Sequence, residues 1–137
     1  MDGMGTYGTF GRPRGTVVVS MKSVRWSEIA AGAVAYPFYK EYKETVLALT
    51  RVPGVESVIV WGSVAEGRFR DDSDMDIVVI TRDGEKRDAE NFISRIPGKA
   101  RWDIFIYENS DFAAASRAGV PFIRDIEKKG RRIETAR

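Results

Sequence analysis

Acidic side chains with strand-like spacing occur in the segment "RDDSDMDIVVI", residues 70–80. Asp74 and Asp76 are two residues apart, and side chains with this spacing lie on the same face of a strand. Two carboxylates this close repel each other unless a cation lies between them. A third acid, Asp103, lies inside the alternating segment "ARWDIFIYE". If the two strands are neighbours, the three carboxylates converge and can hold two Mg²⁺ ions for phosphoryl transfer.

Two other interpretations of these acids explain the sequence less well. A solvated turn accounts well for Asp71 and Asp72, which precede the strand pattern, but poorly for Asp76, which lies inside it. A calcium-binding loop that starts at Asp72 has Ile77 at its sixth position, where such loops require glycine. The strand pattern therefore favours a cation site at Asp74 and Asp76 over both alternatives.

A glycine–serine turn precedes the acids. The segment "VIVWGS" predicts a strand that ends at Gly62 and Ser63. If a helix begins there, its free backbone N–H groups form a site for a phosphate-sized anion, and glycine lets the anion approach closely. The segment is not a P-loop, because Arg68 and Phe69 replace the required lysine and hydroxyl residue. It therefore predicts a phosphate site upstream of the acids.

Absent residue types limit the chemistry further. The 137-residue chain contains no histidine and no cysteine, which excludes Ser-His-Asp and Cys-His catalysis, thiolate metal sites and disulfide bonds. Metal ligands would then be oxygen atoms, which favours Mg²⁺, Mn²⁺ or Ca²⁺. The net charge of +2 does not by itself indicate a nucleic-acid partner. Scarce Asn, Gln and Cys together with many charged residues fits a thermophile.

Length and composition predict one soluble domain. Residues 1–22 begin with a glycine-rich stretch and predict a flexible N-terminal arm, in which "TVVVS" (16–20) could pair on a sheet edge. Residues 23–137 then form the single folded domain. No apolar run approaches the roughly 18 residues that span a bilayer, and no secretory signal pattern is present. We therefore expect a cytoplasmic protein without a membrane partner.

Hydrophobic periodicity predicts the elements that position these residues. The predicted strands cover residues 55–62, 74–81 and 100–108. The predicted helices cover residues 27–35, 37–49, 87–95, 110–119 and 121–129. Ser27 is the expected N-cap of the first helix. This order predicts a mixed α/β (α+β) domain, with helices packed on a small mixed β-sheet.

The pattern of Gly62-Ser63, ten intervening residues, Asp74-x-Asp76 and an apolar strand resembles the minimal nucleotidyltransferase family of the DNA polymerase β superfamily. Asp103 matches the third carboxylate of that family. Further matches are Ala65, Gly67, Arg70, Asp72 and Ser73. The resemblance covers roughly residues 55–108 and, more weakly, 122–134, which is similar to the family's closing helix and short tail strand. The sequence departs at Val64 and Glu66, where basic residues are frequent, and this leaves Arg68 and Arg70 as the expected phosphate-binding cations.

The resemblance implies a polymerase β-type nucleotidyltransferase fold. It also implies transfer of a nucleoside monophosphate from an NTP to a hydroxyl, with release of pyrophosphate. In that family pattern, Asp74, Asp76 and Asp103 bind two Mg²⁺ or Mn²⁺ ions, and Asp103 also activates the acceptor hydroxyl. Gly62 and Ser63 hold the phosphates, assisted by Arg68 and Arg70. Neither the base nor the acceptor is identified by the sequence.

Two other functional readings remain open at this point. Minimal members of the family resemble antitoxins that pair with a helical HEPN-type toxin, so the chain could instead be a binding module that neutralises such a partner, with or without modifying it. A homo-oligomer is a further partner option. The simplest reading is a plain α/β domain with acidic turns.

Overall fold

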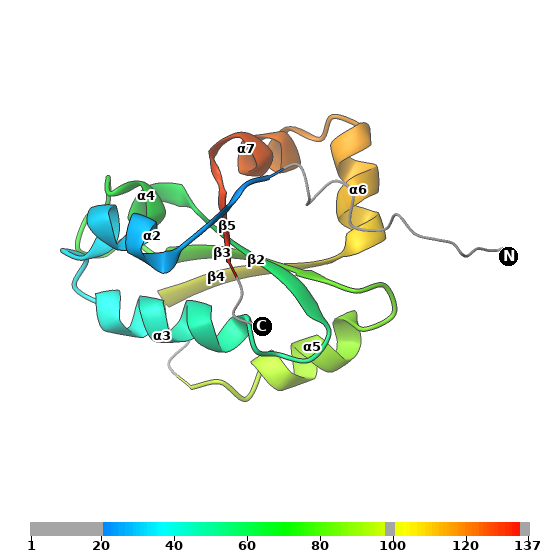
Figure 1. Cartoon of the computed structure of the whole chain (residues 1–137), viewed down its shortest axis with the longest axis horizontal. Helices are drawn as coiled ribbons and strands as arrows, with labels where there is room; N and C mark the ends of the chain where they lie inside the picture. The colour runs from blue at the N-terminus through cyan, green and yellow to red at the C-terminus, as the bar shows by residue number, and fades with distance from the viewer. Residues whose placement is uncertain (1–20, 98–100, 135–137) are drawn as a thin grey trace, which may run out of the picture.

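The computed structural model describes residues 21–97 and 101–134, which form a five-stranded sheet with helices on both faces (Figure 1). The strand order is β1-β5-β2-β3-β4. The strands are β1 (Ser23–Val24), β2 (Val55–Trp61), β3 (Met75–Thr81), β4 (Trp102–Glu108) and β5 (Arg131–Ile133). The helices are α2 (Trp26–Ala33), α3 (Tyr39–Leu49), α4 (Gly62–Glu66), α5 (Lys86–Ile93), α6 (Asn109–Arg117) and α7 (Pro121–Lys129). The predicted mixed α/β architecture is confirmed.

Strands β2 and β3 form the centre of the sheet. They pair antiparallel, whereas β3 and β4 pair parallel and are connected through helix α5. Residues 58–60 and 77–80 are fully buried, because both faces of the two central strands are covered. Strands buried on both faces have continuous apolar runs rather than strict alternation, and this explains "VIV" and "IVVI" in the sequence.

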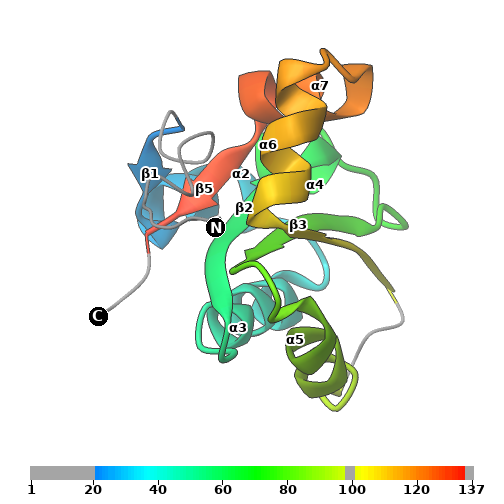
Figure 2. The same cartoon turned by 90° about the vertical axis from the view of Figure 1, so that its right-hand side faces the viewer.

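Two hydrophobic cores lie on opposite faces of the sheet. Figure 2 shows α6 and α7 on one side of the strands and α3 and α5 on the other. Helices α2, α3 and α5 cover one face, and α6 and α7 cover the other. Alternate residues of β3 divide between them: Ile77 and Val79 belong to the first core, whereas Val78 and Ile80 belong to the second. This alternation places Asp76 on the same face as Val78 and helix α7.

Most element boundaries agree with the predictions to within a few residues, but the expected N-cap is wrong. Helix α2 begins at Trp26, before Ser27, and its N-cap is Arg25. The backbone N–H of Arg25 donates to a carboxylate oxygen of Glu28 at 3.1 Å, which stabilises the earlier start. Similarly, α3 begins at Tyr39 rather than at Pro37.

Helix α2 packs directly against α4. Gly67 ends α4 with a φ of +75°, and a Cβ there would lie 2.9 Å from the carbonyl oxygen of Gly32 in α2. Only glycine allows both the left-handed backbone and this close approach. The contact keeps α4 at one end of the sheet.

Met21, which the sequence analysis placed in the N-terminal arm, packs against the domain. Met21 is buried in the core under α7, and its carbonyl oxygen accepts a hydrogen bond of 3.0 Å from the Arg132 guanidinium. The rest of the predicted arm, including "TVVVS", lies outside the described residues. Within the described part of the chain, no helix has the length and apolar character to cross a membrane.

Candidate active site

The carboxylates of Asp76 and Asp103 come from neighbouring strands. In the parallel pairing of β3 and β4, the two residues are direct partners. Neighbouring strands are about 4.8 Å apart, and paired residues project to the same face. Asp74 immediately precedes β3 and is exposed. The strands that carry Asp76 and Asp103 are therefore neighbours, which is the condition on which the sequence analysis expected the acids to converge.

The electrostatics of Asp76 reflect the charges of the other two acids. Its pKa is raised to about 6, first by burial, then by the negative charge of Asp103, and then by that of Asp74. Burial and like charge both disfavour the ionised form. A divalent cation would remove this penalty, because it would neutralise the charges that repel each other.

The donor chemistry of these acids fits a hard divalent cation. Carboxylate oxygens from Asp74, Asp76 and Asp103 are the ligands that Mg²⁺ and Mn²⁺ prefer. Among residues 21–97 and 101–134, no group of three acidic side chains already has the arrangement of a complete metal site. The raised pKa of Asp76 is therefore the observation that favours a divalent cation at these acids, since the part of the chain that the structure describes does not show a complete set of metal ligands.

The backbone turn at Gly62 lies against the Asp76 carboxylate. Strand β2 passes directly into α4, and Gly62 has a φ of +87°. A Cβ on Gly62 would overlap the carboxylate and would lie 3.0 Å from the Asp76 Cγ. The glycine–serine turn and the acidic strand therefore meet in space. Whether this turn holds a phosphate stays a prediction.

A tyrosine that the sequence analysis did not single out supports the loop before β3. The Tyr36 hydroxyl donates to the carbonyl oxygen of Ser73, the residue before Asp74. Burial raises the pKa of Tyr36, while the positive charge of Arg101 lowers it and the charge of Asp74 raises it. Tyr36 therefore belongs to the surroundings of the site. Tyr36 and Ser73 are 37 residues apart in the sequence, so no local sequence pattern connects Tyr36 with the acids.

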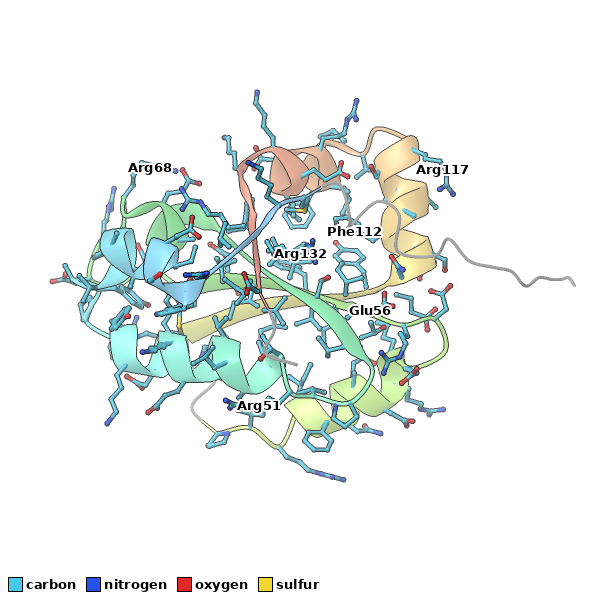
Figure 3. All side chains as sticks on the ribbon, viewed as in Figure 1. Arg51, Glu56, Arg68, Phe112, Arg117 and Arg132 are labelled. Atoms are coloured by element: carbon cyan, nitrogen blue, oxygen red, sulfur yellow. The ribbon has the colours of Figure 1, made fainter. Side chains whose placement is uncertain are left out.

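The arginines expected near the phosphates differ in their surroundings. Arg68 is bound by the Glu66 carboxylate at 2.8 Å, at the α4 end of the sheet (Figure 3). Arg70 is exposed, and its backbone N–H donates to the Ser73 hydroxyl oxygen at 2.8 Å. Arg101 lies over the Phe38 ring, 4.4 Å from its centroid. Arg101 is therefore a further cation, two residues before Asp103 in the chain, and Glu66 competes for Arg68.

A polar pocket of about 240 Å³ lies elsewhere. It is lined by Glu56, Arg82, Asp83, Glu85 and Asn109. These residues are near the start of β2 and the ends of β3 and β4, whereas Asp76 and Asp103 are near the starts of β3 and β4. Figure 3 shows Glu56 and Arg68 at separate places along the sheet. The pocket is therefore not part of the carboxylate site.

Comparison with known families now decides which family this arrangement represents. The family described as "Polymerase beta, Nucleotidyltransferase" matches residues 43–135. The chain belongs to the polymerase β nucleotidyltransferase family. The matched region runs from α3 to the end of the described chain, so it includes the Gly62 turn and all three acids. The nucleotidyltransferase fold suggested by the sequence resemblance is thus confirmed.

One solved structure resembles part of this chain. It is a crystal structure from Sulfolobus solfataricus, of a protein whose assignment as a nucleotidyltransferase is provisional. The two chains are 24% identical, the TM-score is 0.37, and the match covers 55% of this chain and 78% of the other. No curated protein matches this sequence.

Proposed function

We propose that this nucleotidyltransferase uses Mg²⁺ or Mn²⁺ to transfer a nucleoside monophosphate from an NTP to a hydroxyl acceptor. The observation that carries the proposal is the direct pairing of Asp76 with Asp103, beside the Gly62 turn. Family membership supports nucleotidyl transfer in general. The metal, the NTP and the individual roles are the content of this proposal.

Each acid has a distinct part in the proposed reaction. Asp74 and Asp76 would hold two divalent ions, and Asp103 would complete the ligand set. Bound there, such ions neutralise phosphate charge and lower the pKa of the acceptor hydroxyl. The carboxylate of Asp103 receives the proton of that hydroxyl. The hydroxyl oxygen forms a bond to the α-phosphorus, and the bond from this phosphorus to pyrophosphate breaks.

The groups around the acids hold the triphosphate. The backbone N–H groups of Gly62 and Ser63 at the start of α4 would donate to the β- and γ-phosphates, and the Ser63 hydroxyl would add a donor. Arg70 supplies positive charge, and Arg68 does so once Glu66 releases it. Arg101 adds charge from the β4 side. Preorganised donors and cations of this kind are the main source of rate enhancement in phosphoryl transfer.

A labelling experiment tests the proposal. The purified protein is incubated with each α-³²P-labelled NTP, with Mg²⁺ or Mn²⁺ and with lysate of its source organism. We expect label in an acceptor with wild type but not with Asp76→Asn. Asp71→Asn is the matched control, because Asp71 is an exposed acid of the preceding turn and should transfer label normally. No transfer by the wild type with any NTP would contradict the proposal.

The alternative function, pairing with a helical HEPN-type partner, requires a different readout. Co-purification of such a partner with both wild type and Asp76→Asn, in the absence of any label transfer, would favour the binding module. Complex formation together with transfer to the partner would make the partner the acceptor. Comparison of wild type with Asp76→Asn therefore distinguishes a metal-dependent transferase from a binding module.

A further inference from the structure

Three aromatic rings from separate elements contact one another beside the acids. Trp61 ends β2, Phe105 lies in β4, and Phe122 lies in the first turn of α7. The Phe122 ring is 5.2 Å from the Trp61 ring and 5.2 Å from the Phe105 ring, centroid to centroid, and both pairs meet edge to face. Trp61, Phe105 and Phe122 are referred to below as the aromatic wall.

Both ends of the aromatic wall adjoin a carboxylate. Trp61 is the cross-strand partner of Asp76 in the pairing of β2 and β3. Phe105 follows Asp103 by two residues in β4, and this spacing places both side chains on one face of the strand. The wall therefore borders Asp76 and Asp103 on the face of the sheet that α7 covers.

Contacts between Trp61 and α7 hold the aromatic wall in place. The indole N–H of Trp61 donates to a carboxylate oxygen of Asp125 at 3.1 Å. The other carboxylate oxygen of Asp125 is 3.3 Å from the ammonium of Lys129. Phe122 lies between the other two rings. The wall is thus anchored at Trp61, and its other end is less covered.

Phe105 is the more exposed end of the aromatic wall. This residue is 37% exposed and lies on β4, an edge strand of the sheet. Val120, the residue before α7, is also exposed. An isolated exposed apolar residue needs no explanation, but Phe105 belongs to an anchored ring cluster next to acidic residues. A flat aromatic face in this position fits a flat aromatic ligand.

We propose that the aromatic wall binds the nucleobase of the NTP by stacking on Phe105, its most exposed ring. This inference rests on the proposed function, because it assumes that the triphosphate lies between the Gly62 turn and the acids. Every base has an aromatic face, so stacking tolerates different bases. The structure therefore assigns to Phe105 a contribution to nucleotide affinity with little discrimination among the four bases.

Calorimetric titration tests this proposal with two ligands. One is adenosine 5′-(α,β-methylene)triphosphate, which cannot be cleaved at the reacting bond, and the other is inorganic tripolyphosphate, which has no base. Both are titrated in Mg²⁺. For Phe105→Ala we expect a Kd for the analogue that is about 5- to 100-fold higher, in line with the usual effect of removing an aromatic stacking partner. The Kd for tripolyphosphate should not change.

Three further variants make the result specific. Phe92→Ala removes another exposed phenylalanine, 48% exposed, on α5 at the opposite face of the sheet, and should bind both ligands like wild type. Phe105→Tyr keeps the ring and should retain the affinity for the analogue. Phe105→Leu keeps apolar packing without the ring and should lose that affinity, which separates stacking from damage to the fold.

The outcomes separate this inference from the proposed function. If wild type binds neither ligand, the proposed function is overturned, and the inference with it. If wild type binds both but Phe105→Ala binds the analogue equally well, only the inference is overturned. It is also overturned if Phe105→Ala weakens both ligands equally, or if it raises only the KM for the hydroxyl acceptor.

Discussion

Asp76 in β3 and Asp103 in β4 are direct partners across two parallel strands. At the interstrand spacing of about 4.8 Å, their carboxylates cannot both ionise without mutual repulsion. The pKa of Asp76, raised to about 6 by burial and then by its acidic neighbours, shows this effect. Without a cation, the protein therefore loses stability where it is proposed to perform chemistry. Removal of the Asp76 charge is therefore expected to lower activity and to raise the stability of the metal-free protein.

Asp76→Asn should abolish nucleotidyl transfer and stabilise the metal-free protein. Loss of one proposed metal ligand should lower kcat at least about 100-fold, as for removal of a key charge-stabilising group elsewhere. Loss of the buried negative charge should raise the Tm in EDTA at pH 8. Thermal melts and initial rates measure the two effects. A lower Tm in EDTA would contradict the electrostatic account.

The metal-free protein should become less stable as pH rises from about 4 to about 7. The folded pKa of Asp76, about 6, lies above its usual value of 3.8, so stability is fully present below pH 3.8 and is lost as pH passes through 6. A shift of about two units, reduced because the group is only half-buried, corresponds to about 1–2 kcal/mol. Urea unfolding in EDTA measures this, and Asp76→Asn should remove that contribution.

Mg²⁺ or Mn²⁺ should stabilise the wild type at neutral pH. A ligand that binds only the folded state adds stability as its concentration exceeds its Kd, by about 2.7 kcal/mol at 100 times Kd. The Tm shift should disappear in Asp76→Asn and persist in Asp71→Asn. An equal shift in both variants would mean that the ions bind elsewhere.

Tyr36→Phe should weaken the site through the loop that carries Asp74. It removes the hydrogen bond to the Ser73 carbonyl, which contributes about 1 kcal/mol to stability. Misplacement of Asp74 should also lower Mn²⁺ affinity about 10-fold or more, as with other groups that orient metal ligands. Tyr39→Phe is the control, because Tyr39 accepts a hydrogen bond from the Trp26 indole instead. It should not change Mn²⁺ affinity, which calorimetry measures.

Gly62→Ala should inactivate the enzyme, whereas Gly84→Ala should not. Both glycines have positive φ values, +87° and +84°, so alanine costs about 1 kcal/mol of backbone strain at each. Only at Gly62 does the new Cβ meet the Asp76 carboxylate, since Gly84 has open space around it. Activity assays and chemical denaturation of both variants separate the steric effect from the strain. Comparable activity in the two would show that the Gly62 contact does not matter.

Several parts of the fold could be predicted from local sequence. Pro121 at the first position and Gly130 after the last residue bounded α7 correctly, because proline suits the start of a helix and glycine commonly follows its end. The alternation in "ARWDIFIYE" agrees with the structure, in which Trp102, Ile104 and Ile106 pack against one core. The glycine–serine turn and the position of Asp76 inside a strand were evident from the same kind of pattern. These features depend on interactions between residues only a few positions apart.

The tertiary structure decided which of these residues meet. Parallel pairing of β3 with β4 brings Asp103 to Asp76, and nothing local to either strand encodes that register. The contact from Tyr36 to Ser73 and the aromatic wall of Trp61, Phe105 and Phe122 likewise join segments far apart in sequence. Periodicity indicates which face of an element is buried, but the partner that buries it is selected by packing of the whole chain. The sequence alone therefore determined the chemical groups and their local order, and the packing of the sheet and helices assembled them into a candidate site.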